Sequence, residues 1–532
     1  MSHPVAASLD KQPWGFHKRY RDWGGQCDAR HGPYGRRQYQ SPPGLAVGGL
    51  DTWFRTKTIG EPHADTGLRR CLTTMDLIFL GIGGIIGAGI FVLTGVAAAL
   101  DAGPAIVLSF LVSGLACAFT ALSYAELAAA VGGSGSAYGY AYAGLGEIIA
   151  WIVGWDLVLE YGVATSAVAI GWSGYVKNAF TAVGLHLPLA FTKVNIYAIA
   201  AWGLALVHHR VPAAIAKQAA TGGFVNAPAA LIILALSLVL VAGVRQSAAL
   251  NGLMVLVKLA VIGLFIAVAA FHVTPGNWHP FMPFGWPGVM HGAALIFFAY
   301  IGFDAVSTAA EETRNPRRSL PIGIIVSLAV CTIIYVVVSG LLTSIVPYFT
   351  LNSPSPVAQS MLNLGHPFVA LLIGVGAIVG LTSVMLVLFY GLTRIFLAMA
   401  RDGLLPPVFA AVHTRTQTPV RVILICGVFM ALIAGLTPIA YVAELVNIGT
   451  LSAFAIVCAG VLVLRYTKPD LPRPFRAPGS PWVPLLGMAF CLYLMLNLPL
   501  VTWIRFVVWF VIGMAIYLAY GRSHSALATK QG

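Results

Sequence analysis

Residues 77–95 read LIFLGIGGIIGAGIFVLTG, an apolar stretch long enough to cross a bilayer. Five glycines crowd its middle: Gly81, Gly83, Gly84, Gly87 and Gly89. Glycine weakens a helix by about 1 kcal/mol per residue relative to alanine, so this segment can give up helical hydrogen bonds where a ligand replaces them. Irregular backbone at membrane depth must line a cavity or be buried in protein. The pattern therefore predicts a broken helix.

A second interrupted segment lies at residues 293–308, AALIFFAYIGFDAVST, where Gly302 and Asp304 break an apolar run. Paired interruptions in the two halves of a membrane protein are typical of a transporter's substrate site. The alternative is that the small residues only allow helices to pack closely.

The composition predicts a polytopic helical membrane protein. Hydrophobic residues make up 58% of the 532 residues and charged residues 9%, and the mean hydropathy is +0.84, which is outside the range of ordinary soluble domains. Apolar windows long enough to span a membrane predict about twelve helices, near residues 74–100, 104–131, 145–176, 227–244, 250–271, 288–310, 320–346, 367–399, 420–436, 440–464, 481–498 and 502–520.

The net charge of +13 follows from topology. Arginines and lysines cluster before the first span and after the sixth, eighth and tenth spans, and these positions share one side if both termini are cytoplasmic, as the positive-inside rule requires. The long loop after the third span is the exception, and long loops count less in that rule. No aromatic interleaving favours nucleic acid. We expect an integral protein of a bacterial inner (plasma) membrane.

The two ends of the chain differ from the middle. Residues 1–70 are polar and lack the apolar region of a secretory signal, so we expect a disordered cytoplasmic tail. Alternatively, translation starts near residues 50–55. Residues 521–532 are expected to form a second cytoplasmic tail. The seven cysteines suit neither a disulfide framework nor a zinc site.

Four motifs in order carry a resemblance to a known family: GIGGIIGAGIFVLTG at 81–95, GWDLVLEY at 154–161, FFAYIGFDAVSTAAEETRNPRRSLP at 297–321 and RDGLLP at 401–406. Together they resemble the amino acid, polyamine and organocation (APC) superfamily of permeases, most closely the cationic amino acid transporter branch and its bacterial homologues. The resemblance implies an all-α, LeuT-like transporter domain over residues 71–520. Its two inverted five-helix repeats would cover about 74–271 and 288–464, followed by helices 11 and 12 at 481–520. Helices 1 and 6 would be discontinuous.

The breaks suit an α-amino acid, because its carboxylate and ammonium each need a partner in a low dielectric. Backbone N–H groups at the start of a half-helix suit the carboxylate, and carbonyls at the end of the other half-helix suit the ammonium. The resemblance assigns the carboxylate to Ile85, Gly87, Ala88 and Gly89, and the ammonium to carbonyls of Phe298, Ala299 and Ile301. Relatives often carry Ser or Thr at the position of Ala88. Alanine has no hydroxyl, so this chain cannot make a side-chain hydroxyl contact with the substrate at that position.

Lys258 lies about nine residues into the fifth span, about 12 Å from its cytoplasmic end. A lysine at that depth costs up to roughly 3 kcal/mol unless it is paired or neutral. In similar proteins a lysine here occupies the volume that sodium fills in sodium-coupled relatives, which makes Lys258 a candidate proton switch. Snorkelling or structural pairing is the alternative.

Acidic residues within spans form a further set of candidates. Asp156 and Glu160 are four residues apart, so they share a helix face. By resemblance Glu160 is the better candidate for proton coupling or for substrate contact, and Asp304 could pair with Lys258 as part of the proton-coupling set. A structural role is equally compatible with these residues, and with Glu126 and Glu444. Glu311 and Glu312 indicate a cytoplasmic helix end, either a gate or an anchor.

No enzyme motif, metal-ligand spacing or cofactor motif occurs in the chain. The sequence therefore favours a secondary amino acid transporter that works as a proton symporter by alternating access. Two alternatives stay open: an exchanger of amino acids or polyamines on the same fold, and a membrane scaffold without transport. The expected partners are the amino acid, the proton and the lipid bilayer.

Overall fold

The computed structural model describes residues 54–57, 70–131, 133, 135–182, 184–185, 188, 191–192, 194, 223–353, 355–414 and 416–529, with only the backbone at 182, 244–248, 440–441 and 528–529. All of them belong to one unit, Ala46–Gly532. Most of the predicted N-terminal tail and most of the loop after the third span lie outside the described residues. Within the predicted tail, Lys57 is described, and its backbone N–H donates to the Tyr142 carbonyl at 3.0 Å.

The described residues are helical, with isolated bridges such as Leu72–Thr313 and no strand, which confirms the all-α prediction. The first half of the chain contains α1 (Thr74–Ile85), η2 (Gly89–Leu93), α2 (Thr94–Ala97), η3 (Ala98–Ala102), α3 (Ile106–Ala130), α4 (Ser136–Gly144), α5 (Glu147–Val158), η5 (Leu159–Val163), α6 (Ala164–Ala182), α9 (Ala227–Ala242) and α10 (Val244–Ala270).

The second half begins with another interrupted helix and ends with long ones. It contains α11 (Gly285–Ile296), η8 (Phe297–Tyr300), α12 (Ala305–Thr308), η9 (Ala310–Glu312), α13 (Pro316–Ile345), α14 (Pro356–Asn363), α15 (Pro367–Arg401), α16 (Val420–Leu436), α17 (Ile439–Thr467), α18 (Trp482–Leu496), α19 (Leu500–Ile516), η12 (Tyr517–Gly521), α20 (Arg522–His524) and α21 (Ala526–Thr529).

Length and apolarity identify membrane helices. Among the described residues, eight helical segments are long and apolar enough to cross a bilayer, and α9, α16 and α18 are shorter apolar helices. The first segment, Thr74–Ala130, has 57 residues, more than twice what one crossing needs, and it turns at Gly103, whose φ is +63°. Apolar side chains such as Leu500, Ile504 and Val511 are exposed along α19, as expected for a lipid-facing surface.

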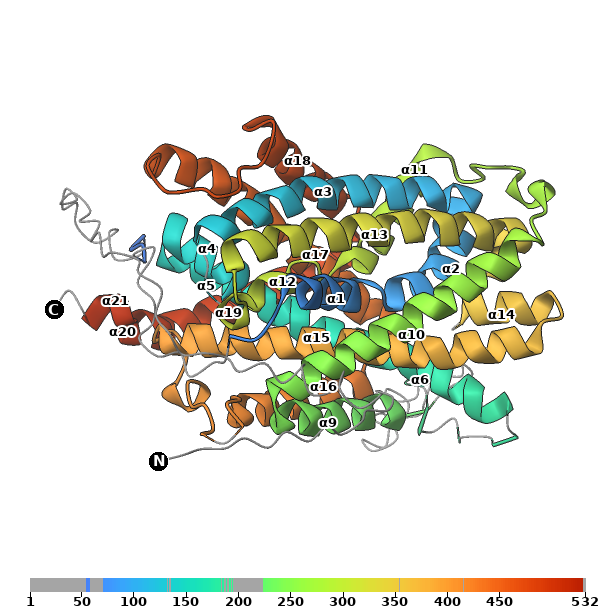
Figure 1. Ribbon diagram of the computed structural model, residues 1–532, viewed down its shortest axis with the longest axis horizontal. Coiled ribbons are helices and arrows are strands. Elements are labelled where there is room, and N and C mark those ends of the chain that lie inside the picture. Colours follow the sequence, from blue (N-terminus) through green and yellow to red (C-terminus); the bar gives the residue numbers. More distant parts are fainter. Residues whose placement is uncertain are drawn as a thin grey trace, which may run out of the picture. The chain divides into compact units, whose positions relative to one another are not determined.

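The broken helices lie inside the bundle. α1 packs against α13, α10 and α15, and α12 packs against α1; Figure 1 shows α1 in the middle with these long helices around it. Thr73 starts α1 with a capping box, in which the Asp76 N–H donates to the Thr73 hydroxyl and the Thr73 N–H donates to the Asp76 carboxylate. The first helix therefore has a fixed beginning.

Candidate functional site at the two helix breaks

The first break follows Ile85. Ile86 is extended, with φ −74° and ψ 99°, and its N–H makes the last α-type bond, to Ile82 at 3.1 Å. The chain becomes helical again at Gly89. Because the first N–H groups of any helix have no intrahelical acceptor, those after Ile86 are available to a ligand. The positive end of the helix dipole favours an anion there.

The second break follows Tyr300. α11 tightens into the 3₁₀ turn η8, Ile301 is extended, and Gly302 has φ +116°, a conformation that favours glycine. The Phe298 carbonyl accepts a long hydrogen bond from the Ile301 N–H, at 3.4 Å, and because a carbonyl has two lone pairs it can still accept from a cation. Asn447 on α17 satisfies two earlier carbonyls, because its amide donates to Ala294 at 3.0 Å and Leu295 at 3.2 Å.

The two breaks touch each other. A Cβ on Gly89 would lie 2.2 Å from the Ala299 α-carbon, and a Cβ on Gly302 would lie 2.7 Å from the Gly84 carbonyl carbon. Tyr335 on α13 joins both breaks, because its hydroxyl lies 2.6 Å from the Ile85 carbonyl and 2.8 Å from the Ala299 carbonyl. A hydroxyl has one hydrogen, so the donation is shared between the two carbonyls.

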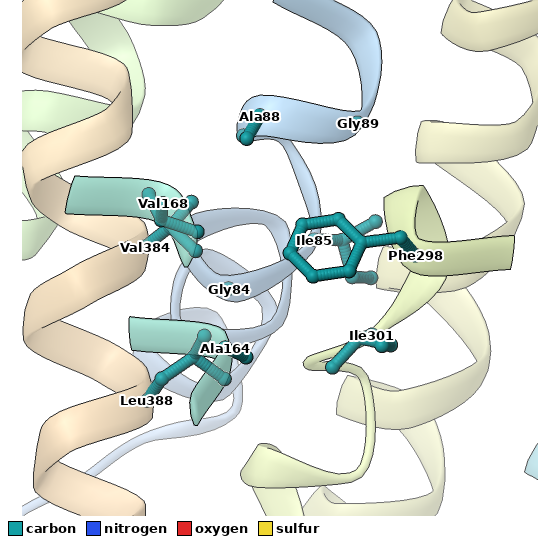
Figure 2. A pocket seen from close by; sticks show the side chains of 11 residues that line it. Gly84, Ile85, Ala88, Gly89, Ala164, Val168, Phe298, Ile301, Val384 and Leu388 are labelled. Carbon is teal, nitrogen blue, oxygen red and sulfur yellow. The ribbon is translucent and has the colours of Figure 1, made fainter. Parts of the chain in front are cut away.

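A small cavity of about 10 Å³, enough for about one water molecule, lies between the breaks. In Figure 2, Phe298 and Ile301 lie across the cavity from side chains of α6 and α15. The cavity is lined by Gly84, Ile85, Gly87, Ala88, Gly89, Ala164, Val168, Phe298, Ile301, Val384 and Leu388. Six of the seven residues predicted for substrate binding are among them. Ala299 is not, because it packs on Gly89 and its carbonyl contacts Tyr335.

Lys258 on α10 is fully buried beside the first break. Its Nζ donates to the carbonyls of Gly83 and Ile86, each at 2.9 Å, and to the Ser383 hydroxyl at 3.0 Å. The side chain does not snorkel to a membrane surface. Its ammonium nitrogen lies among three oxygen acceptors, a nest in the plain sense of an oxygen-lined site, and these oxygens would also suit a small cation. All three N–H donors are used, so the expected pair between Lys258 and Asp304 is wrong.

Asp304 and Glu160 are fully buried and close enough to interact electrostatically, near the second break. Asp304 accepts hydrogen bonds from the Tyr161 hydroxyl and, at 3.3 Å, from the Gly302 N–H. Glu160 is fully buried in η5, and neither of its carboxyl oxygens has a hydrogen-bond partner among the described residues. The hydroxyl of Thr450 on α17 lies near Glu160 without closing a hydrogen bond. An unpaired buried carboxyl is costly, so Glu160 is suited to take up a proton or a donor.

Two acidic residues without an assigned role have structural partners. Glu126 lies 2.5 Å from Arg465 and 3.5 Å from Arg473, and it accepts from the Ala477 N–H at 2.8 Å. Glu444 lies 3.6 Å from Arg505 and accepts from the Thr502 hydroxyl at 2.8 Å. These contacts support anchoring roles away from the cavity.

Glu312 is part of a buried ion pair that sequence reasoning missed. It lies 3.0 Å from Arg394 on α15, with both side chains 2% exposed, and it also accepts from Tyr390. A charge inside the apolar run of α15 was a signal that could have identified Arg394. Tyr335, Ser383 and the α6 and α15 lining residues carry no such signal, because apolar and hydroxyl side chains are common in spans.

Comparison with known proteins agrees with the fold. The family described as "Amino acid permease" matches residues 72–521. The chain is 48% identical over 481 residues to the branched-chain amino acid permease BcaP of Bacillus subtilis, covering 89% of this chain and 98% of that protein. It is 45% identical over 481 residues to the methylthioribose transporter of the same organism, covering 90% and 100%.

An animal relative extends the comparison. Cationic amino acid transporter 4 of Mus musculus is 39% identical over 423 residues, covering 79% of this chain and 63% of that protein. These matches confirm the resemblance to APC permeases. The chain therefore belongs to the amino acid permease family, and it is an integral membrane transporter rather than an enzyme.

Proposed function

We propose that this protein carries an α-amino acid across the plasma membrane by alternating access, with the substrate held between the two breaks. The carboxylate would accept from backbone N–H groups at Gly87, Ala88 and Gly89, and the ammonium would donate to carbonyls of Phe298 and Ile301. The contact between the breaks carries this proposal, because it brings a helix N-terminus and a helix C-terminus to one cavity.

The cavity lining favours an apolar substrate side chain. Ala164, Val168, Val384 and Leu388 face it, and no charged or hydroxyl side chain is among its lining residues. A cationic side chain, or the hydroxyls of a methylthioribose, would lose hydrogen bonds to water without replacing them, at a cost of about 1–3 kcal/mol per group. Of the substrates named for the relatives, branched-chain amino acids therefore suit this cavity best.

The coupling ion in this proposal is the proton. Lys258 fills the nest of oxygens in which a sodium ion would otherwise be held, and Glu160 and Asp304 provide buried carboxyl groups next to the second break. A proton taken up by Lys258, Glu160 or Asp304 would change the hydrogen bonds that these side chains make around the two breaks. Transport would then follow the proton gradient.

The proposed topology has twelve crossings arranged as two inverted repeats of five, with helices 11 and 12 added. Twelve crossings result when Thr74–Ala130 counts as two and the three shorter apolar helices are included. Two segments far apart in the sequence meet at Asp402, because Lys57 lies 2.7 Å from its carboxylate and the Ala526 N–H donates to its carbonyl at 2.9 Å. The basic residue Lys468 contacts Ala143 at this end. We assign this face to the cytoplasm.

Uptake of labelled L-leucine into proteoliposomes tests the proposal. A symporter accumulates label in empty liposomes when an inward proton gradient is applied. An exchanger accumulates it only when unlabelled leucine is loaded inside. Absence of uptake under both conditions, with correctly folded protein, contradicts amino acid transport.

A further inference from the structure

Two histidines meet at the face opposite Asp402. His272 follows the end of α10, and His366 immediately precedes Pro367 at the start of α15. Their Nε2 atoms lie 3.2 Å apart, and their rings cross at 76°. Both residues are partly buried and lie outside the candidate spans. In Figure 1 the end of α10 and helix α14, which precedes His366, lie at the same end of the molecule.

The hydrogen bond of His272 fixes its ring. Its Nδ1 lies 2.9 Å from the Val268 carbonyl. A carbonyl only accepts, so Nδ1 carries the hydrogen and the Nε2 of the neutral ring presents a lone pair to His366. Metal-bound histidines characteristically donate their other ring N–H to a backbone carbonyl or carboxylate in this way.

The separation of the two nitrogens suits a shared metal ion. Zinc binds imidazole nitrogen at about 2.0–2.1 Å, so two nitrogens at a tetrahedral angle lie about 3.4 Å apart. We propose that His272 and His366 bind a divalent transition-metal ion of the Zn²⁺ class, with solvent completing the coordination. The described residues contain no group of three potential His, Cys, Asp or Glu ligands. Binding is therefore weaker than at three-ligand zinc sites.

Metal binding at this position would restrain η2 and α2, the helical segments that follow the first break. α14 packs against η2 and α2, and a Cβ on Gly95 of α2 would lie 2.5 Å from the Pro356 Cβ of α14. A metal that links His366 to the end of α10 therefore fixes α14 over the outer half of the broken helix. Because alternating access needs these elements to move, occupancy of the site slows transport.

The binding test uses untagged full-length protein titrated with Zn²⁺ in a calorimeter, and with Co²⁺ followed by visible absorption. The chain has eleven other histidines, so wild type is compared with His272→Gln, His366→Gln and the control His279→Gln, an exposed histidine of the same loop. Each site variant is expected to lose one ion or to bind it at least tenfold more weakly, while the control matches wild type. Equal binding by all four proteins overturns the proposal. Absence of binding to wild type overturns it too, and would mean that the two rings are joined by a direct hydrogen bond.

The transport arm adds Zn²⁺ outside proteoliposomes. Wild type and His279→Gln are expected to be inhibited, and His272→Gln and His366→Gln to resist. Equal inhibition of wild type and the site variants overturns the link between this site and transport. The binding arm does not depend on the proposed function, so a protein without amino acid uptake still decides whether the metal site exists.

Discussion

At the scale of single residues, Gly89 sets how closely the two breaks approach. A Cβ there would lie 2.2 Å from both the α-carbon and the Cβ of Ala299, far inside van der Waals contact, and backbone cannot move aside as a side chain can. We expect Gly89→Val to reduce amino acid binding by more than tenfold, because the second break is pushed away from the N–H groups of the first.

The matched control for this variant is Gly263→Ala on α10, where a Cβ meets no atom within 4 Å. Size-exclusion profiles of both variants report folding, and equilibrium binding of labelled L-leucine reports the site. Normal binding by Gly89→Val would show that the carboxylate is held elsewhere.

Lys258 is the second residue with a specific prediction. Replacing it with alanine removes the group that donates to Gly83, Ile86 and Ser383, but leaves the cavity lining in place. Lys258→Ala is therefore expected to retain leucine exchange and to lose proton-driven accumulation. Lys177→Ala, at the end of α6, serves as the control and keeps both activities. Undiminished accumulation by Lys258→Ala would mean that the lysine is only structural.

At the scale of elements, Glu312 and Arg394 join η9, the last turn of the second broken helix, to α15. Both side chains are 2% exposed, and removing one partner of a buried ion pair typically costs about 3–5 kcal/mol. We expect Glu312→Gln to lower the unfolding temperature clearly. Glu444→Gln removes a carboxylate that is 29% exposed. Because solvent-accessible ion pairs contribute about 1 kcal/mol or less, we expect this variant to lower the unfolding temperature less than Glu312→Gln does.

Thermal unfolding of the two variants in the same detergent checks this prediction. If both shift by the same amount, the Glu312–Arg394 pair does not hold these elements together.

The sequence predicted the breaks because their cause is local. Glycines at 87, 89 and 302 weaken helices wherever the chain places them, and the family resemblance indicated which residues beside them bind the substrate. The partners of the breaks could not be predicted this way. Tyr335, Ser383 and Asn447 come from three other helices, and their contacts depend on how those helices pack. For the same reason the pairing of Asp304 with Lys258 was expected wrongly: Tyr161 lies nearer to Asp304, and three oxygens already surround Lys258.

At the scale of the whole molecule, the arrangement of charges predicts the coupling ion. Lys258 occupies the nest beside the first break, so there is no room for a sodium ion. Leucine uptake into proteoliposomes is expected to be unchanged when sodium is replaced by choline, and to rise with an inward proton gradient. Uptake that requires sodium would contradict this view of Lys258.

The central claim is that one break holds the substrate's carboxylate and the other its ammonium. Competition against labelled L-leucine by 4-methylpentanoate, which lacks the amino group, and by 3-methylbutylamine, which lacks the carboxylate, tests this claim most directly. Each analogue is expected to bind at least tenfold more weakly than leucine, a loss of about 1.4 kcal/mol or more, because one break is left without its charged partner. If either analogue competes as well as leucine, the corresponding break does not bind the substrate.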